Sequence, residues 1–233
     1  MVAEVKPHPR FQGIYEVFLR HNSKRLATKN LAVGKSVYGE PLIRHKSGEY
    51  RFWDPFRSKF AAAILKGLGT VPMRPSQKVL YLGAASGTTA SHVSDLVGEE
   101  GYVYCVEFAP RAIRELVDNV CAFRANMSPI LADARLPERY SALVGKVDAI
   151  YCDVAQPQQA KVLADNAEVF LAENGGIMLM IKAQSIDVTK DPSVVYEQEI
   201  ETLKARGFRI KEVVHLEPYD KAHATIVAEQ RGK

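Results

Sequence analysis

The chain has few cysteines, no long apolar run and no strong excess of one charge. Its 233 residues include three cysteines, none of them in a C-x-x-C pair, so we expect buried free thiols in a reducing compartment rather than a disulfide framework. No apolar run approaches the roughly 18 residues of a membrane span, and the N-terminal residues lack the apolar core of a secretion signal. We therefore expect an intracellular, cytoplasmic protein.

Positive charge is in slight excess, with 31 lysines and arginines against 27 acidic residues, which is less than proteins that bind nucleic acid on their own usually carry. Basic residues do gather between Arg44 and Lys59, where aromatic residues alternate with them. Cations and aromatic rings together suit phosphates and stacked bases, although a solvated hairpin with inward aromatic side chains gives the same pattern. The modest net charge indicates that RNA affinity is shared with partners.

After residue 55 the chain alternates between strand and helix patterns. Strands are predicted at Lys78–Leu82, Tyr102–Glu107, Met127–Leu131, Val147–Cys152 and Gly176–Ile181, with Arg209–Leu216 and Ala224–Glu229 as a closing antiparallel pair. Helices are predicted after Ser58 and near Thr88–Leu96, Pro110–Ala122, Gln158–Leu171 and Ser193–Ala205. This order predicts an α/β fold with a mostly parallel sheet covered by helices on both faces.

The first 54 residues have a different pattern. Two alternating runs, Leu31–Tyr38 and Pro41–Phe52, are broken by glycines and are typical of hairpins in a small antiparallel sheet. We therefore expect a β-rich lobe over residues 1–54 and the α/β domain over residues 55–233.

The segment Val79–Thr89 carries the strongest functional signal, because an apolar strand runs into small residues and then into a helix start. The small residues are Gly83, Ala84, Ala85 and Gly87. They let a ligand approach the backbone, and Glu107, 24 residues after Gly83, is placed to accept ribose hydroxyl groups. Ala85 stands where the G-x-G-x-x-G pattern has its second glycine, which disfavours a diphosphate and favours S-adenosyl-L-methionine. A turn kept small for packing alone is the alternative.

Four titratable residues follow predicted parallel strands, namely Glu107, Asp133, Asp153 and Lys182. Ligands of open α/β sheets gather beyond the carboxyl ends of the strands, and a charged group beside a buried strand needs a partner or solvent. These residues therefore predict the walls of one site. A turn or cap residue is the alternative interpretation of Asp133.

Several motifs together resemble one family. They are Asn30-Leu31, Val37 to Glu40, Glu49-Tyr50-Arg51, Trp53 to Lys59, Leu80 to Thr89, Val106-Glu107-Phe108, Asp153 to Pro157 and Glu217 to His223. The combination is similar to fibrillarin, the 2′-O-methyltransferase of box C/D ribonucleoproteins, over essentially the whole chain. The departures are Asp54, where the family more often has Asn, and Phe60, where it often has Leu. The Gly/Arg-rich N-terminal extension of eukaryotic members is absent, which indicates the short archaeal form.

The resemblance implies a Rossmann-like S-adenosylmethionine-dependent methyltransferase fold and a set of cofactor contacts. Thr88 and Thr89 would contact the methionine moiety, and Glu107 the ribose. Phe108 would lie beside the adenine, with Asp133 and Ala134 at its edge. The full predicted cofactor set is Gly83, Ala84, Ala85, Gly87, Thr88, Thr89, Glu107, Phe108, Asp133, Ala134, Asp153, Val154, Ala155 and Gln156.

The catalytic Lys-Asp-Lys-His set of the family falls on Lys59, Asp153, Lys182 and His223. His223 is preferred to His215 because it follows Glu-Pro-Tyr, as the histidine of the family does. A ribose 2′-hydroxyl must lose its proton as it attacks a methyl group. We hypothesise that Lys182 accepts this proton and that Lys59 gives electrostatic support. Asp153 would link the two lysines, and His223 would position them. No metal ligand is expected.

The resemblance also implies partners. The targets would be rRNA and tRNA, selected by pairing with a box C/D guide RNA. A coiled-coil scaffold protein and a kink-turn-binding, ribosomal-protein-like subunit would hold the enzyme over the chosen nucleotide. Such an enzyme needs little sequence readout of its own, because base pairing supplies the specificity.

Other functions share parts of this pattern. A methyltransferase for a protein or a small molecule would use the same cofactor loop, although two lysines would repel a cationic substrate. A non-catalytic structural subunit of an RNA particle is a second alternative, and the presence of Lys59, Asp153 and Lys182 speaks against it. A nicotinamide-dependent reductase is disfavoured by Ala85.

Overall fold

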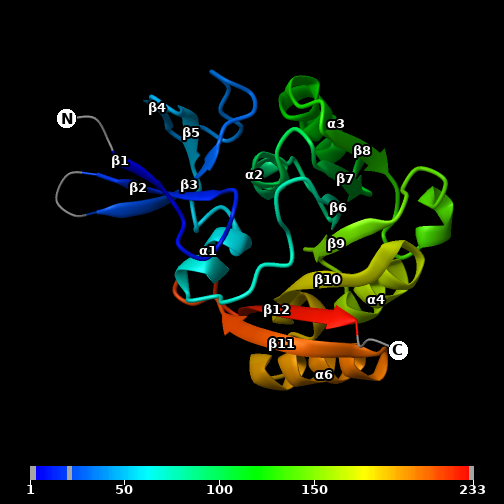
Figure 1. Ribbon diagram of the computed structural model, residues 1–233. Helices are drawn as coiled ribbons and strands as arrows, with labels where there is room; N and C mark the ends of the chain where they lie inside the picture. Colours follow the sequence, from blue (N-terminus) through cyan, green and yellow to red (C-terminus); the bar gives the residue numbers. More distant parts are fainter. Residues whose placement is uncertain (1–3, 20–22, 231–233) are drawn as a thin grey trace.

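A computed structural model describes residues 4–19 and 23–230, which form two β-sheets (Figure 1). The first sheet is antiparallel and has five strands in the order β1-β2-β3-β5-β4. Its strands are β1 (Glu4–Pro7), β2 (Ile14–Phe18), β3 (Lys24–Lys29), β4 (Leu42–His45) and β5 (Gly48–Phe52).

The second sheet has seven strands in the order β11-β12-β10-β9-β6-β7-β8. The five strands from β10 to β8 are parallel, and β12 is antiparallel to both of its neighbours. The strands are β6 (Lys78–Leu82), β7 (Tyr102–Glu107), β8 (Met127–Leu131), β9 (Val147–Cys152), β10 (Leu171–Lys182), β11 (Phe208–His215) and β12 (His223–Gln230). The predicted mostly parallel sheet with an antiparallel C-terminal edge is confirmed.

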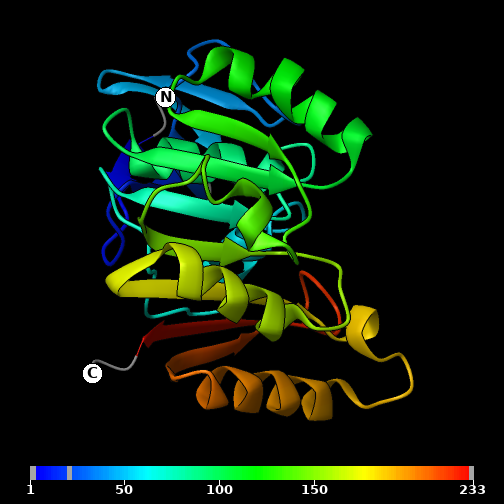
Figure 2. The same cartoon turned by 90° about the vertical axis from the view of Figure 1, so that its right-hand side faces the viewer.

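Helices cover both faces of the second sheet (Figures 1 and 2). Along β6 the side chains alternate, so that Val79 belongs to a core cluster with residues of α1, α2 and α3, whereas Leu80 belongs to the cluster on the opposite face, with residues of α4 and α6. The helices are α1 (Lys59–Leu65), α2 (Thr88–Val97), α3 (Pro110–Asn119), α4 (Gln159–Phe170), α5 (Ala183–Ile186) and α6 (Pro192–Ala205), with 3₁₀ turns at Cys121–Phe123 and Pro137–Tyr140. Within residues 4–19 and 23–230, no helix has the length and apolarity that crossing a membrane requires.

The predicted strand at Leu31–Tyr38 is wrong, because this segment forms consecutive turns. Side chains take the place of a strand ladder there: Asn30, Glu40 and Glu49 hydrogen-bond to backbone groups of the segment. All three side chains are buried. The alternation of the sequence therefore reflects a loop folded over polar anchors rather than a pleated strand.

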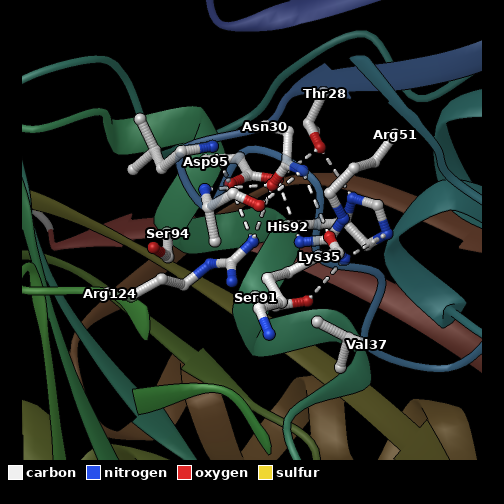
Figure 3. A network of polar contacts seen from close by, with 12 residues as sticks. Thr28, Asn30, Lys35, Val37, Arg51, Ser91, His92, Ser94, Asp95 and Arg124 are labelled. Atoms are coloured by element: carbon white, nitrogen blue, oxygen red, sulfur yellow. Dashed lines mark hydrogen bonds and ion pairs between the residues drawn. The ribbon is translucent and has the colours of Figure 1, made fainter. Parts of the chain in front are cut away.

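A buried network of polar and charged side chains joins the first sheet to α2 (Figure 3). It consists of Thr28, Glu40, Arg51, His92, Asp95 and Arg124. Arg51 of β5 lies 2.7 Å from Glu40 and 3.2 Å from Asp95 of α2. Arg124 lies 3.2 Å from the other carboxylate oxygen of Asp95.

His92 extends this network towards the first sheet. Its Nδ1 lies 2.8 Å from the hydroxyl of Thr28, which donates to Asp95. Burial, together with the charges of Arg51 and Arg124, holds the pKa of His92 well below its usual value. The His92 imidazole is therefore neutral at physiological pH.

Candidate active site

The carboxyl ends of β6, β7, β9 and β10 meet at one edge of the second sheet. Gly83, directly after β6, has a φ of +80°, and a Cβ atom there would lie 2.7 Å from the carbonyl oxygen of Asp153 at the end of β9. Only glycine fits this position, because the left-handed backbone and the close approach both exclude a side chain. The glycine thus lets the loop after β6 lie directly against the loop after β9.

Beside these loops lies a cavity of about 190 Å³. Ten of the predicted cofactor residues line it: Gly83, Ala85, Glu107, Phe108, Asp133, Ala134, Asp153, Val154, Ala155 and Gln156. Ala132 and the predicted catalytic Lys182 complete its wall. The residues expected at strand ends are therefore brought together around one space, which is the arrangement the strand order predicts.

The Glu107 carboxylate is fixed by the backbone around the cavity. Its two oxygens accept hydrogen bonds from the amides of Ala85 and Ala109, each at 2.9 Å. Because each carboxylate oxygen has two lone pairs, Glu107 can still accept two hydroxyl groups from a ligand. Phe108 follows it with 63% of its surface exposed, so one apolar ring is free to cover a flat ligand.

Asp133 has both of the roles that the sequence left open. It lines the cavity, and it also accepts a hydrogen bond from the Arg135 amide, as a turn residue does. The hydrogen bonds and charge of Arg135 hold the pKa of Asp133 below its usual value. Its carboxylate is therefore partly engaged within its own loop.

The other four predicted cofactor residues, Ala84, Gly87, Thr88 and Thr89, do not line the cavity. Gly87 caps α2 in a left-handed conformation, and a Cβ atom there would meet α3. The Thr89 hydroxyl donates to Ser58 just before α1, at 3.1 Å. The start of α2 is thus directed towards α1 rather than into the cavity.

Three of the four predicted catalytic residues form one ion-pair cluster, the catalytic cluster of Lys59, Asp153 and Lys182. The Nζ atom of Lys182 lies 2.9 Å from Asp153 Oδ1 and 3.0 Å from the Asp153 carbonyl oxygen. The Nζ atom of Lys59 lies 3.3 Å from Asp153 Oδ2. Both carboxylate oxygens of Asp153 are thus occupied by lysine ammonium groups, which fixes the two amines relative to each other.

The fourth predicted residue, His223, is connected to the catalytic cluster through Asp220. His223 Nδ1 lies 2.9 Å from Asp220 Oδ1, and Asp220 lies 3.9 Å from Lys59 Nζ. Nδ1 is also 2.6 Å from the Lys221 carbonyl oxygen, so Nδ1 carries the proton and Nε2 is the acceptor in the neutral ring. Burial raises the pKa of Asp220, but the hydrogen bond from His223 and the nearby lysines outweigh it and hold the pKa below its usual value.

Two buried side chains fix the backbone that carries the lysines. Ser58 caps α1 by accepting from the Ala61 amide, and it also accepts from the Trp53 indole at 2.8 Å. Gln159 accepts from the Lys182 amide at 3.0 Å, where β10 extends past the end of its ladder with β9. Sequence reasoning missed these roles and that of Asp220. The serine just before a helix start was a usable signal for Ser58, but Gln159 has no local signal.

The match to known proteins extends over the whole chain. Residues 5–232 match the family model for fibrillarin. A fibrillarin-like rRNA/tRNA 2′-O-methyltransferase of Pyrobaculum aerophilum is 56% identical over 231 residues, which cover 99% of this chain and 98% of the relative. The chain belongs to the fibrillarin family.

Solved fibrillarin structures show the same fold. The structure of Aeropyrum pernix fibrillarin with natively bound S-adenosyl-L-methionine has a TM-score of 0.91 at 52% identity, covering 98% of this chain and all of that one. A fibrillarin in complex with Nop5p has a TM-score of 0.85 at 40% identity, covering 97% of this chain and all of that one. The expected Rossmann-like methyltransferase fold is confirmed.

Proposed function

We propose that this chain transfers a methyl group from S-adenosyl-L-methionine to a ribose 2′-oxygen of rRNA and tRNA. The observation that carries the proposal is the pair of lysines, Lys59 and Lys182, on the single carboxylate of Asp153, beside a cavity that Glu107 lines. Membership of the fibrillarin family supports the same activity.

The cavity has the donors and acceptors that the adenosine part of the cofactor needs. Glu107 would accept the two ribose hydroxyls, and Phe108 would cover the adenine ring. Asp133 and Ala134 would meet the edge of the base, and Asp153 to Gln156 would close the pocket. When bound, the cofactor supplies a methyl group on a sulfonium ion, which leaves readily by in-line displacement.

The methionine end of the cofactor would lie outside the cavity described above. Gly83 and Ala84 would leave the backbone open to it, and Thr88 and Thr89 at the start of α2 would supply hydroxyl groups. Gly87 would hold that helix start in place. Thr88 at this helix start is partly exposed, whereas Thr89 is buried and its hydroxyl group already donates to Ser58.

The catalytic cluster would manage the proton of the ribose hydroxyl. In its neutral amine form Lys182 would take the proton of the 2′-hydroxyl group as that oxygen accepts the methyl group. Lys59 would give electrostatic support beside the reacting oxygen, and the carboxylate of Asp153 would hold both amines in place. His223 would orient the cluster through Asp220, and the fixed geometry would supply much of the rate enhancement.

We infer that the chain acts as the catalytic subunit of a box C/D guide-RNA particle. A fibrillarin 40% identical to it was solved with Nop5p, which supports a coiled-coil scaffold partner here. A guide RNA would choose the target nucleotide, and a kink-turn-binding, ribosomal-protein-like subunit would complete the particle. The slight net charge of +4 agrees with an enzyme that relies on such partners for RNA affinity.

Transfer of a tritiated methyl group from S-adenosyl-L-methionine to a target RNA tests this function. The guide RNA and the two partner proteins are each present or omitted, and the modified nucleotide is mapped. We expect label on the 2′-oxygen of the paired nucleotide in the complete mixture only. Cofactor binding without transfer to RNA in that mixture would contradict the proposal and favour another substrate class or a structural role.

A further inference from the structure

A groove lies outside the site described above. It has a volume of about 550 Å³ and lies between the first sheet and the segment that leads into α1. We call it the arginine groove, after Arg25 of β3 and Arg57 just before α1. Aromatic rings of Tyr38, Phe52 and Phe56 also line it.

The two arginines have an unusual environment. The Arg25 guanidinium lies 5.4 Å from the centre of the Phe52 ring, and that of Arg57 lies 5.8 Å from the centre of the Tyr38 ring. Both residues are exposed, and among residues 4–19 and 23–230 neither is paired with a carboxylate. Stacking on a ring orients a guanidinium but does not neutralise it, so both charges remain available to an anion.

The acidic side chains of the groove are engaged within the protein. Glu40 pairs with Arg51 in the buried network, and Asp54 accepts from the Phe56 amide at 2.9 Å. The remaining cation of the groove, Lys24, pairs with Glu16. Among the described groove residues, two unpaired cations, Arg25 and Arg57, thus stand against one unpaired carboxylate, that of Asp54, and the net charge is positive.

The arginine groove adjoins the catalytic cluster through side-chain contacts of Phe56. Phe56 is 69% exposed, and its ring packs edge-on against Tyr219 with 5.2 Å between ring centres. Tyr219 precedes Asp220, which lies 3.9 Å from the Nζ atom of Lys59. A strand that places a ribose at the lysines would thus have its neighbouring nucleotides beside Phe56 and Arg57.

We propose that the arginine groove binds the backbone of the target RNA next to the methylated nucleotide. Arg25 and Arg57 would contact phosphates, and Phe56 would stack on an unpaired base. This inference rests on the proposed function and adds a substrate-binding surface to it. A protein segment is less well matched, because among the described groove residues two unpaired cations outnumber the single unpaired carboxylate of Asp54.

The test uses the complete particle with the double variant Arg25→Ala/Arg57→Ala. Arg10→Ala is the matched control, since Arg10 is exposed and lies 5.3 Å from the Phe11 ring but lines a different cavity. We expect the KM for target RNA to rise about 10-fold in the double variant, as for two lost surface charge contacts. The slope of log KM against log salt should fall by about 1.4, or 0.7 per phosphate of a single strand. Binding of S-adenosyl-L-methionine should not change, and Arg10→Ala should match wild type.

Photo-crosslinking gives an independent readout. Target RNA carrying 4-thiouridine next to the modified nucleotide should crosslink to a peptide containing Phe56 in the wild-type particle. Wild-type kinetics in the double variant, with crosslinks elsewhere, would overturn the groove while leaving the proposed function intact. Loss of scaffold-protein binding in the absence of RNA would also overturn it and assign the groove to a protein. If the wild-type particle methylates no RNA, the proposed function fails first.

Discussion

Two clusters of charge in this molecule are built from similar parts and differ in exposure. In the buried network the side chains of Arg51, Asp95 and Arg124 are all 0% exposed. In the catalytic cluster the side chains of Lys59 and Lys182 are 18% and 19% exposed. Each cluster places two cations on one aspartate, one inside the protein and one at a cavity.

The choice of cation matches the position. A guanidinium keeps its proton at any physiological pH and forms several hydrogen bonds in a fixed plane, which suits a permanent link. An ammonium group on a flexible stem can lose its proton under the influence of its neighbours. The comparison teaches that arginine–aspartate clusters here serve the fold, whereas the lysine–aspartate cluster is suited to chemistry.

The largest effect should come from removing the amine of the catalytic cluster while keeping its charge. In Lys182→Arg, methyl transfer should fall by about 10²–10⁴-fold, the usual contribution of a general base, because a guanidinium cannot accept the proton. Stability and cofactor affinity should stay near wild type. Single-turnover kinetics measure the rate of methyl transfer, and calorimetry measures the affinity for the cofactor. Near-normal transfer in Lys182→Arg would mean that Lys182 acts through its charge alone.

In the buried network, removing a cation should change stability rather than catalysis. Arg51→Met should lower the free energy of unfolding by about 3–5 kcal/mol, because it leaves the buried Glu40 without its ion-pair partner and removes one of the two arginines on Asp95. Denaturant unfolding measures this. The control is Arg111→Ala, since Arg111 is 94% exposed in its pair with Glu115 and should change stability by less than about 1 kcal/mol. A small effect in Arg51→Met would remove the contrast between the two clusters.

A smaller effect should follow from disturbing the backbone under Lys182. Gln159→Leu keeps the volume but removes the acceptor for the Lys182 amide, so turnover should fall by up to about 10²-fold through misplacement of the amine. Gln158→Leu is the matched control, because Gln158 is exposed. The cofactor Kd should be unchanged in both variants. Equal activity of the two variants would show that Gln159 has no positioning role.

The smallest effect concerns pH. The pKa of His92 is lowered in the folded state, so below the unfolded value of about 6.5 the unfolded chain binds a proton that the folded chain does not. Stability should therefore fall as the pH drops below this value, by up to about 1.4 kcal/mol per pH unit. In His92→Gln this slope should be shallower between pH 6.5 and 5. The measurement compares the slopes of unfolding free energy against pH, so a constant loss of stability caused by the substitution cancels. Equal slopes in wild type and His92→Gln would contradict the lowered pKa of His92.

The sequence predicted the second sheet well because its strands are short apolar runs that end at charged residues. β6, β7, β8 and β9 have the predicted bounds. The predicted strand Gly176–Ile181 covers only the second half of β10. The first half contains the polar residues Glu173 and Asn174 and a register shift against β9, so it lacks an apolar run. The strands β1 and β3 were missed because exposed lysine and arginine residues weaken their apolar signal. The strand β2 was also missed, although its sequence is largely apolar.

The site residues that could be predicted from the sequence are charged residues at the ends of predicted strands. Glu107, Asp153 and Lys182 meet as their positions implied. Asp220 and Gln159 were not predictable, because their roles depend on contacts between distant segments. The division of the chain at residue 54 stays a prediction, and the buried network shows how tightly the two sheets are joined across it.

Trp53 makes the junction between the sheets visible to optical spectroscopy. It is the single tryptophan of the sequence, it donates to Ser58 at the start of α1, and its ring stacks on His92 at 4.9 Å with 14° between the planes. All tryptophan fluorescence of the protein therefore comes from one buried point next to a neutral imidazole. An intensity or wavelength change in that signal reports movement of the junction, without any added label.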